Sequence, residues 1–254
     1  MNNLKFCAFE SSQFQAIRHL LCETFNTSDA ELLRLYQALE ADFDKDDWPS
    51  EVSTDRDFFK PQDNHFQSRY DSLKIVACDL PSLLSKGKGD TVMIVAQDPY
   101  STTSSNRIKI GTPYAMHIKG CREKICTKKY FQLIDVLLEQ DYQTYLTDVY
   151  KIYLGKTKLE KKDCQRFAGL LEQEIETINP IAIITWGKAA TKAVARLKLQ
   201  RPHYSYPHPS GAARGAWRRL IQKSATNDNI RDYWKKDILE KLQQQPSKTS
   251  NPTA

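Results

Sequence analysis

The stretch that decides the fold is Thr91–Tyr100, TVMIVAQDPY. Its apolar residues, Val92–Ala96, are followed at once by Gln97 and Asp98. A short apolar run rich in Val and Ile predicts a strand that is buried on both faces. Pro99 ends this strand, because proline cannot donate a hydrogen bond to a sheet. The strand therefore delivers the Asp98 carboxylate to the carboxyl edge of a sheet, where ligands bind in open α/β folds.

The overall composition is that of a globular protein that works away from membranes. No apolar run approaches the length of a membrane span, and the N-terminus, MNNLKFCAFE, lacks the basic start and apolar stretch of a secretory signal. We therefore expect a cytoplasmic protein with no membrane partner. The six cysteines are scattered and form no CxxC pair, so we expect reduced thiols, no metal site and no cofactor.

The charge of the chain is unevenly distributed. Residues 1–90 carry 10 Lys and Arg against 16 Asp and Glu, a net of −6, whereas residues 91–254 carry 27 against 15, a net of +12. A basic excess in the part that holds the strand-end motifs favours a polyanionic partner, most simply DNA. The lysine-rich loop from Lys151 to Lys162 is either a solvated face or a set of phosphate contacts.

The hydrophobic spacing divides the chain into three parts. We expect a helical N-terminal region over residues 1–90 packed on the core, an α/β domain over residues 91–242 and a disordered tail over residues 243–254. In the first part, helices are predicted over Ser12–Phe25, after a cap at Ser28, and within Gln67–Leu84.

Strands alternate with helices in the second part. After the first strand, further strands are predicted over Gln143–Thr147, Ile181–Trp186 and His203–Tyr206. The helices between and after them are expected over Thr127–Gln140, after a cap at Asp163, and over Gly187–Leu197, Ala213–Ser224 and Asn229–Leu242. This alternation implies a parallel sheet covered on both faces. Asp98, Asp148 and His208 each follow a strand, so all three should lie along one edge of that sheet.

Three motifs in this order resemble the uracil-DNA glycosylase superfamily. They are AQDPY after the first strand, YLTDVYK after the second and HPSGAARGAW after the last. The resemblance covers roughly residues 91–220. It implies a three-layer α/β/α fold with a four-stranded parallel sheet, and an enzyme that removes a base from DNA.

The resemblance also implies roles for individual residues. Asp98 matches the carboxylate that orients the attacking water and stabilises the cationic sugar, and His208 matches the histidine that hydrogen-bonds the base O2. The base-binding positions are the backbone at Gln97, Tyr100 at the 5-position of the base and Tyr114 as the stacking ring. Positions expected to contact DNA are Ser101, Ser210 and Arg214, the last in the loop that supplies a wedge, and we add Lys151 to them.

The chemistry of base removal agrees with these residue types. A base inside a duplex must be flipped out and stacked before it can react. Cleavage of the N-glycosidic bond builds positive charge on the sugar and negative charge on the leaving base, which a carboxylate and a hydrogen-bond donor stabilise. Because no lysine is expected at these strand ends, we predict simple hydrolysis to an abasic site without a Schiff base.

Asp148 departs from the family pattern. Uracil-reading members usually have asparagine there, which can accept from N3–H and donate to O4 of uracil. An ionised aspartate only accepts and suits the exocyclic amine of a cytosine-type base, and a protonated one can also donate to N3. We therefore predict a monomeric, monofunctional DNA glycosylase for a modified cytosine-type base, such as one in bacteriophage DNA, acting in antiviral defence on single- or double-stranded DNA. The alternatives are a repair glycosylase for uracil or oxidised uracil, a catalytically silent DNA-binding protein of the same fold, and a metal-dependent nuclease.

Overall fold

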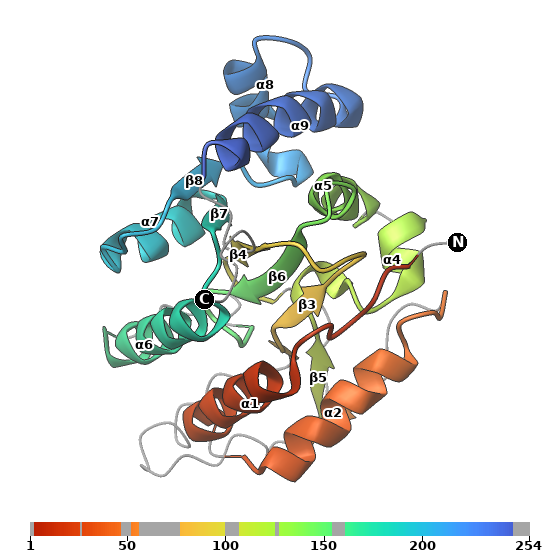
Figure 1. Ribbon diagram of the computed structural model, residues 1–254, viewed down its shortest axis with the longest axis vertical. Coiled ribbons are helices and arrows are strands. Elements are labelled where there is room, and N and C mark those ends of the chain that lie inside the picture. The colour runs from red at the N-terminus through yellow and green to blue at the C-terminus, as the bar shows by residue number, and fades with distance from the viewer. Residues whose placement is uncertain are drawn as a thin grey trace, which may run out of the picture.

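A five-stranded sheet forms the centre of the protein (Figure 1). The computed structural model describes residues 3–25, 27–46, 52–55, 77–99, 107–124, 127–153 and 161–245, with the backbone alone at 161–163. The strand order is β3-β6-β4-β7-β8. The strands are β3 (Ser82–Leu84), β6 (Gln143–Asp148), β4 (Thr91–Ala96), β7 (Ala182–Trp186) and β8 (His203–Tyr206). The predicted parallel strands β6, β4, β7 and β8 are confirmed, and β3 adds an antiparallel edge.

Strand β4 lies in the middle of the sheet because its side chains are apolar on both faces. Val92 to Ala96 are all buried. Backbone pairing with β6 continues beyond the strands, since Val149 N donates to Ala96 O and Tyr150 N donates to Gln97 O, both over 2.9 Å. The chain runs from β4 outward to β6 on one side and then returns to β7 on the other side. Asp98 therefore follows the strand at which the strand order reverses, which is the usual ligand position in such sheets.

Helices cover both faces of the sheet (Figure 1). Helices α5 (Lys128–Leu138) and α9 (Asn227–Gln243) pack together on one face, and α1 (Ser11–Phe25) packs against α6 (Lys161–Ile178) on the other. The other α-helices among the described residues are α2 (Asp29–Ala41), α4 (Lys119–Glu123), α7 (Lys188–Arg196) and α8 (Arg214–Ile221). Their apolar stripes join the strands in one hydrophobic core. The α/β/α fold class predicted from the sequence is therefore confirmed.

The N-terminal region contains strands as well as the first two predicted helices. Ser28 caps α2 as expected, its Oγ accepting from Glu31 N over 3.1 Å. A third helix was predicted within Gln67–Leu84, and it does not reach residues 77–84, which form β2 (Ala77–Asp79) and β3 on either side of Pro81. Proline cannot continue a helix. Residues 67–76 lie outside the described residues.

A second, smaller sheet stands beside the large one. It has the order β1-β5-β2, with β1 (Ser53–Thr54) antiparallel and β2 parallel to β5 (Ile108–Gly111). In β5, Ile108 and Ile110 are buried. This small sheet brings the N-terminal region to the same edge as the strand-end motifs.

Two further boundaries complete the comparison with the sequence. Helix α6 begins at Lys161, so Asp163 lies in its first turn and is not its cap. The division at residues 90 and 242 stays a prediction, and residues 246–254 lie outside the described residues. In the described ranges, no helix combines the length and apolar character that crossing a bilayer requires.

Candidate active site

Three polar side chains occupy the carboxyl edge of the large sheet. Asp98 follows β4, Asp148 is the last residue of β6, and His208 follows β8. The parallel register pairs Ala96 with Asp148, so the Asp98 and Asp148 segments leave the sheet side by side. The edge predicted from the sequence is therefore the one at which these residues are found.

Asp98 is half-buried, and burial raises the pKa of its carboxyl group to about 6. A hydrogen bond from the Gln97 side chain partly opposes this rise in pKa. The backbone at Gln97 is held by Tyr150 N, while the Gln97 side chain is exposed. Asp98 is thus a carboxylate at neutral pH that is only weakly solvated.

His208 is neutral and carries its proton on Nε2. Its Nδ1 accepts a hydrogen bond from Ser210 N over 3.2 Å, so the remaining proton of the neutral ring is on Nε2. Burial, and then the positive charge of Lys129, lower the His208 pKa. Gly187 stands against this ring with a φ of 96°, and a Cβ there would lie 3.4 Å from His208 Cβ. His208 is therefore arranged as a hydrogen-bond donor.

Tyr114 places an aromatic ring next to His208. The two ring centroids are 6.0 Å apart, and Tyr130 stacks on Tyr114 at 4.4 Å with an interplanar angle of 15°. Tyr114 and Ala115 have φ values of 60° and 56°, which cost roughly 1–2 kcal/mol each for residues with a side chain. Such strain is concentrated at functional sites. The Tyr114 hydroxyl oxygen is buried and has no hydrogen-bond partner among the described residues.

Asp148 is buried, with 1% of its surface exposed. Burial, followed by the charge of Asp79, raises its pKa well above the usual value. Asp79, at the end of β2, lies within hydrogen-bonding contact of the Asp148 carboxyl group. The structure therefore adds a second carboxyl group beside Asp148.

Sequence reasoning missed Asp79, although a signal was present. The stretch VACDLP at residues 76–81 repeats the pattern of VAQDP at residues 95–99, in which small apolar residues precede an Asp and a Pro. The helix prediction within Gln67–Leu84 extended over this second strand end and concealed it. Lys129 and Tyr130, in the first turn of α5, were also missed, because helical spacing alone assigns such residues to a surface or a core.

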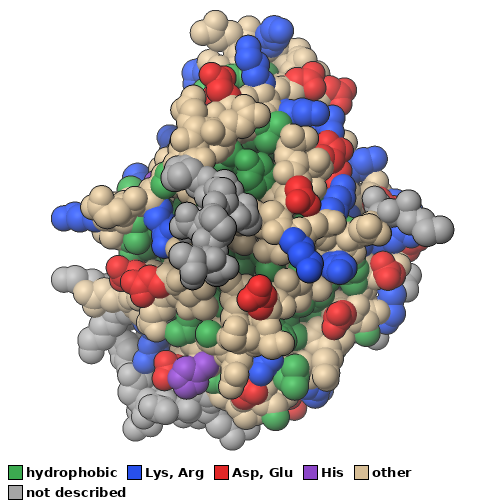
Figure 2. Space-filling view, viewed as in Figure 1, with side chains coloured by type: hydrophobic (Ala, Val, Ile, Leu, Met, Phe, Trp, Pro, Cys, Tyr) green, Lys and Arg blue, Asp and Glu red, His purple; other side chains and the backbone are tan. Residues whose placement is uncertain are grey.

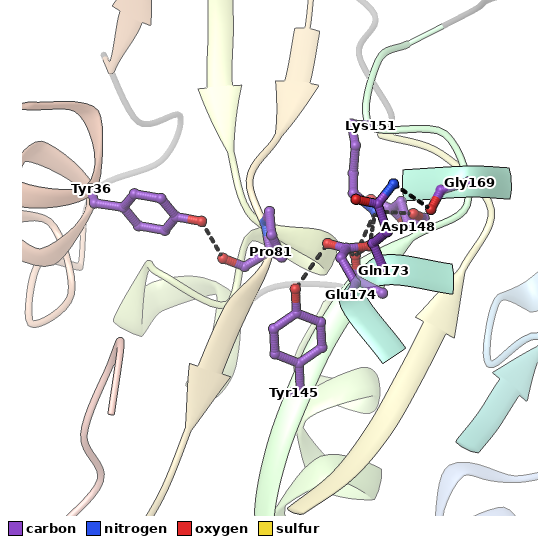
Figure 3. A network of polar contacts seen from close by, with 9 residues as sticks. Tyr36, Pro81, Tyr145, Asp148, Lys151, Gly169, Gln173 and Glu174 are labelled. Atoms are coloured by element: carbon purple, nitrogen blue, oxygen red, sulfur yellow. Dashed lines mark hydrogen bonds and ion pairs between the residues drawn. The ribbon is translucent and has the colours of Figure 1, made fainter. Parts of the chain in front are cut away.

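Lys151 was predicted to contact DNA, and the structure contradicts this. Its side chain points into the interior, where Nζ donates to Thr147 Oγ1 and Glu174 Oε2 over 2.7 Å and to Asp148 O over 2.5 Å (Figure 3). The exposed fractions of the Lys151 and Glu174 side chains are 1% and 0%. A cation held in this way neutralises Glu174 and does not reach a phosphate.

The other predicted DNA-contacting residues have mixed outcomes. Ser210 lies beside His208, to whose Nδ1 its backbone N–H donates. The Arg214 guanidinium donates to Ala225 O and Asn227 Oδ1, so it fastens the connection between α8 and α9. Tyr100 and Ser101 lie outside the described residues. In the part of the chain that is described, no group of His, Cys, Asp or Glu is placed to hold a metal ion.

These features define a three-layer α/β/α protein whose sheet edge holds a carboxylate, a neutral imidazole and an aromatic ring. Residues 87–236 match the uracil DNA glycosylase superfamily, and the chain belongs to that superfamily. Enzymes of this superfamily generally hydrolyse N-glycosidic bonds in DNA. No curated protein gives a match to the chain.

Proposed function

We propose that this protein is a monofunctional DNA glycosylase that removes a flipped, modified cytosine-type base and leaves an abasic site. One observation carries the proposal. Asp98 and His208 leave the same sheet edge, and the Tyr114 ring lies beside His208. A planar base stacked on Tyr114 then has a carboxylate on its sugar side and a hydrogen-bond donor on its own edge.

The proposed reaction uses these two groups on the two charges that develop. Ionised Asp98 orients the water and stabilises the positive sugar as the bond to the base breaks. Neutral His208 donates from Nε2 to the base oxygen, on which negative charge accumulates. Lys151 is enclosed in its ion pair with Glu174, which supports hydrolysis by water and not attack by an amine.

The choice of base rests on Asp148. At the end of β6 it lies next to the segment that carries Asp98, and in our proposal it meets the N3 and position-4 edge of the base. The amine of cytosine donates to a carboxyl oxygen, whereas the O4 of uracil requires a donor. Excision of ordinary cytosine would be toxic to a cell, so a modified cytosine such as those in bacteriophage DNA is the proposed target, with antiviral defence as the role.

Two helices that begin at this edge carry exposed cations for the DNA backbone. Helix α7 starts directly after Gly187 and presents Lys188, Lys192 and Arg196 at intervals of four residues. Arg218 and Arg219 are exposed on α8. In Figure 2, Lys and Arg side chains lie among acidic ones near the top of the molecule, where α8 and α9 are found. Such cations fit phosphate contacts that position DNA without reading its sequence.

Uracil is a second candidate for one specific reason. Burial favours the neutral form of Asp148, and a neutral carboxyl group both donates and accepts, as an asparagine amide does. A fully protonated Asp148 therefore suits the edge of uracil as well.

The proposal is tested with matched oligonucleotides that carry one uracil, cytosine, 5-hydroxymethylcytosine or glucosylated 5-hydroxymethylcytosine. Alkali converts each abasic site into a strand break. We expect breaks at a modified cytosine, and a loss of about 10²–10³ in rate for Asp98→Asn. The matched control is Asp232→Asn, which removes the same negative charge from an exposed side chain on α9. Breaks at uracil alone would refute the modified-cytosine proposal, and an unchanged rate in Asp98→Asn would refute the site.

A further inference from the structure

Two carboxyl groups meet at the position that faces the base edge. Asp79 comes from β2 of the small sheet, and Asp148 comes from β6 of the large sheet. Backbone pairing holds them together, because Asp79 N donates to Lys151 O over 2.8 Å, three residues beyond Asp148. Their side chains lie within hydrogen-bonding contact. The contact is therefore built into the backbone of both sheets.

The small sheet is shaped to accept the Asp79 carboxyl group. In the register of β2 and β5, Asp79 lies opposite Gly111. A Cβ at position 111 would come within 2.9 Å of Asp79 Oδ1, so any larger residue there would displace this carboxyl group. Three residues further along, the same strand delivers Tyr114. Strand β5 thus positions both Asp79 and the aromatic ring.

No cation among the described residues neutralises the pair. Lys151 is the nearest, but its three N–H bonds are directed at Thr147 Oγ1, the Asp148 carbonyl and Glu174 Oε2. Asp148 Oδ2 is buried and has no donor partner among the described residues. Two carboxylates in contact cannot both be ionised in such surroundings, so a proton must separate them.

The groups around the pair favour this proton. Besides Lys151, three titratable groups face the two carboxyl groups. They are Cys78 on β2, Asp98 in the segment after β4 and Tyr114 in the turn before α4. Behind Gly111 lies His117, which is neutral because burial lowers its pKa to about 3. Burial raises the pKa of both Asp79 and Asp148. The charge of Lys151 opposes this rise in pKa but does not outweigh burial, and Lys151 is already paired with Glu174.

We propose that Asp79 is a specificity-determining partner of Asp148, and that the two carboxyl groups hold one proton between them and meet the base as a single acid pair. The inference rests on the proposed glycosylase function for its biological meaning. With one proton between them, the outer oxygens of the pair accept hydrogen bonds and share one negative charge. That arrangement favours the exocyclic amine of a cytosine-type base and disfavours O4 of uracil. A second proton supplies a donor and relaxes this preference.

The protonation of the pair is measured without any substrate. Carboxyl ¹³C shifts of Asp79 and Asp148 are followed against pH in the wild-type protein and in Asp79→Asn, Asp148→Asn and the control Asp232→Asn. We expect two coupled steps in the wild type, with one proton retained at pH 7. In Asp79→Asn, the midpoint of Asp148 should fall by about one pH unit or more, because a negative neighbour is replaced by an amide donor. Independent titration of both groups, each ionised below pH 6 in the wild type, would overturn the proposal.

Base preference provides the second measurement. The ratio of excision of 5-hydroxymethylcytosine to that of uracil should fall as the pH is lowered in the wild type, and it should lose this pH dependence in Asp79→Asn. An identical pH dependence in both proteins would overturn the assigned role of Asp79. Coupled titration in a protein that cleaves none of the oligonucleotides would leave the acid pair standing and refute the proposed function alone.

Discussion

Replacing Lys151 by methionine tests the buried ion pair between Lys151 and Glu174. The sequence had predicted a DNA contact for Lys151 instead. Methionine keeps most of the length of the side chain but removes the charge that neutralises Glu174, whose side chain is 0% exposed. Breaking a buried ion pair costs about 3–5 kcal/mol, because the remaining charge is left without its partner. Glu174 retains hydrogen bonds from Tyr145 Oη over 2.8 Å and from Thr147 Oγ1 over 3.1 Å. We therefore expect a loss near the lower limit, about 3 kcal/mol.

The assay is urea unfolding of Lys151→Met, Glu174→Gln and the double variant, with the slope m compared to confirm that the transition is the same. The double variant removes both charges and keeps an acceptor for Tyr145, so it should lose less stability than the two single variants together. A loss below about 1 kcal/mol in Lys151→Met, or strict additivity, would refute the buried-pair reasoning. The salt dependence of DNA binding should not change, and a decrease of about 0.9 in its slope would restore Lys151 as a phosphate contact.

Three further predictions concern pH and salt. The excision rate should rise as the pH passes about 6, where Asp98 ionises, and Asp98→Asn should lack this step. The His117 pKa is lowered from 6.5 to about 3 by burial, so the unfolded chain binds a proton that the folded protein does not. The free energy of unfolding should therefore fall by about 1.4 kcal/mol for each pH unit as the pH is lowered from about 6.5 to about 3. The His117→Gln variant should lack that contribution. Changing Lys188, Lys192 and Arg196 together to glutamine should weaken DNA binding and reduce its salt slope by about 0.9 for each phosphate that is no longer neutralised.

Each of these three predictions would be contradicted by one specific result. If the excision rate of Asp98→Asn still rises near pH 6, that rise belongs to another titrating group. The same pH slope of stability in His117→Gln would exclude His117 as its source. For the cations on α7, Lys235→Gln with Lys236→Gln on α9 is the control, since both side chains are exposed. Equal salt slopes in the two variants would remove α7 from the DNA interface.

The sequence by itself determined the central sheet and the edge at which its polar residues gather. Buried parallel strands are apolar on both faces, and their ends are marked by polar residues and proline, as at Asp98 and Pro99. These are local signals, so the strands before Asp98, Asp148 and His208 were placed correctly. The first two helices were also predicted, because Ser28 and the apolar spacing after it are local signals too.

Only the tertiary structure decided which side chains face one another. Lys151 has the sequence surroundings of a surface lysine, but the fold turns it toward Glu174 on a helix 23 residues away. Asp79 belongs to a strand too short for periodicity to reveal, and its partner Asp148 lies on the other sheet. Charge and exposure depend on contacts between segments distant in the chain, because burial in the fold sets the energy of each ionised group. For that reason the sequence indicated the sheet edge, whereas the fold decided which carboxyl groups meet there.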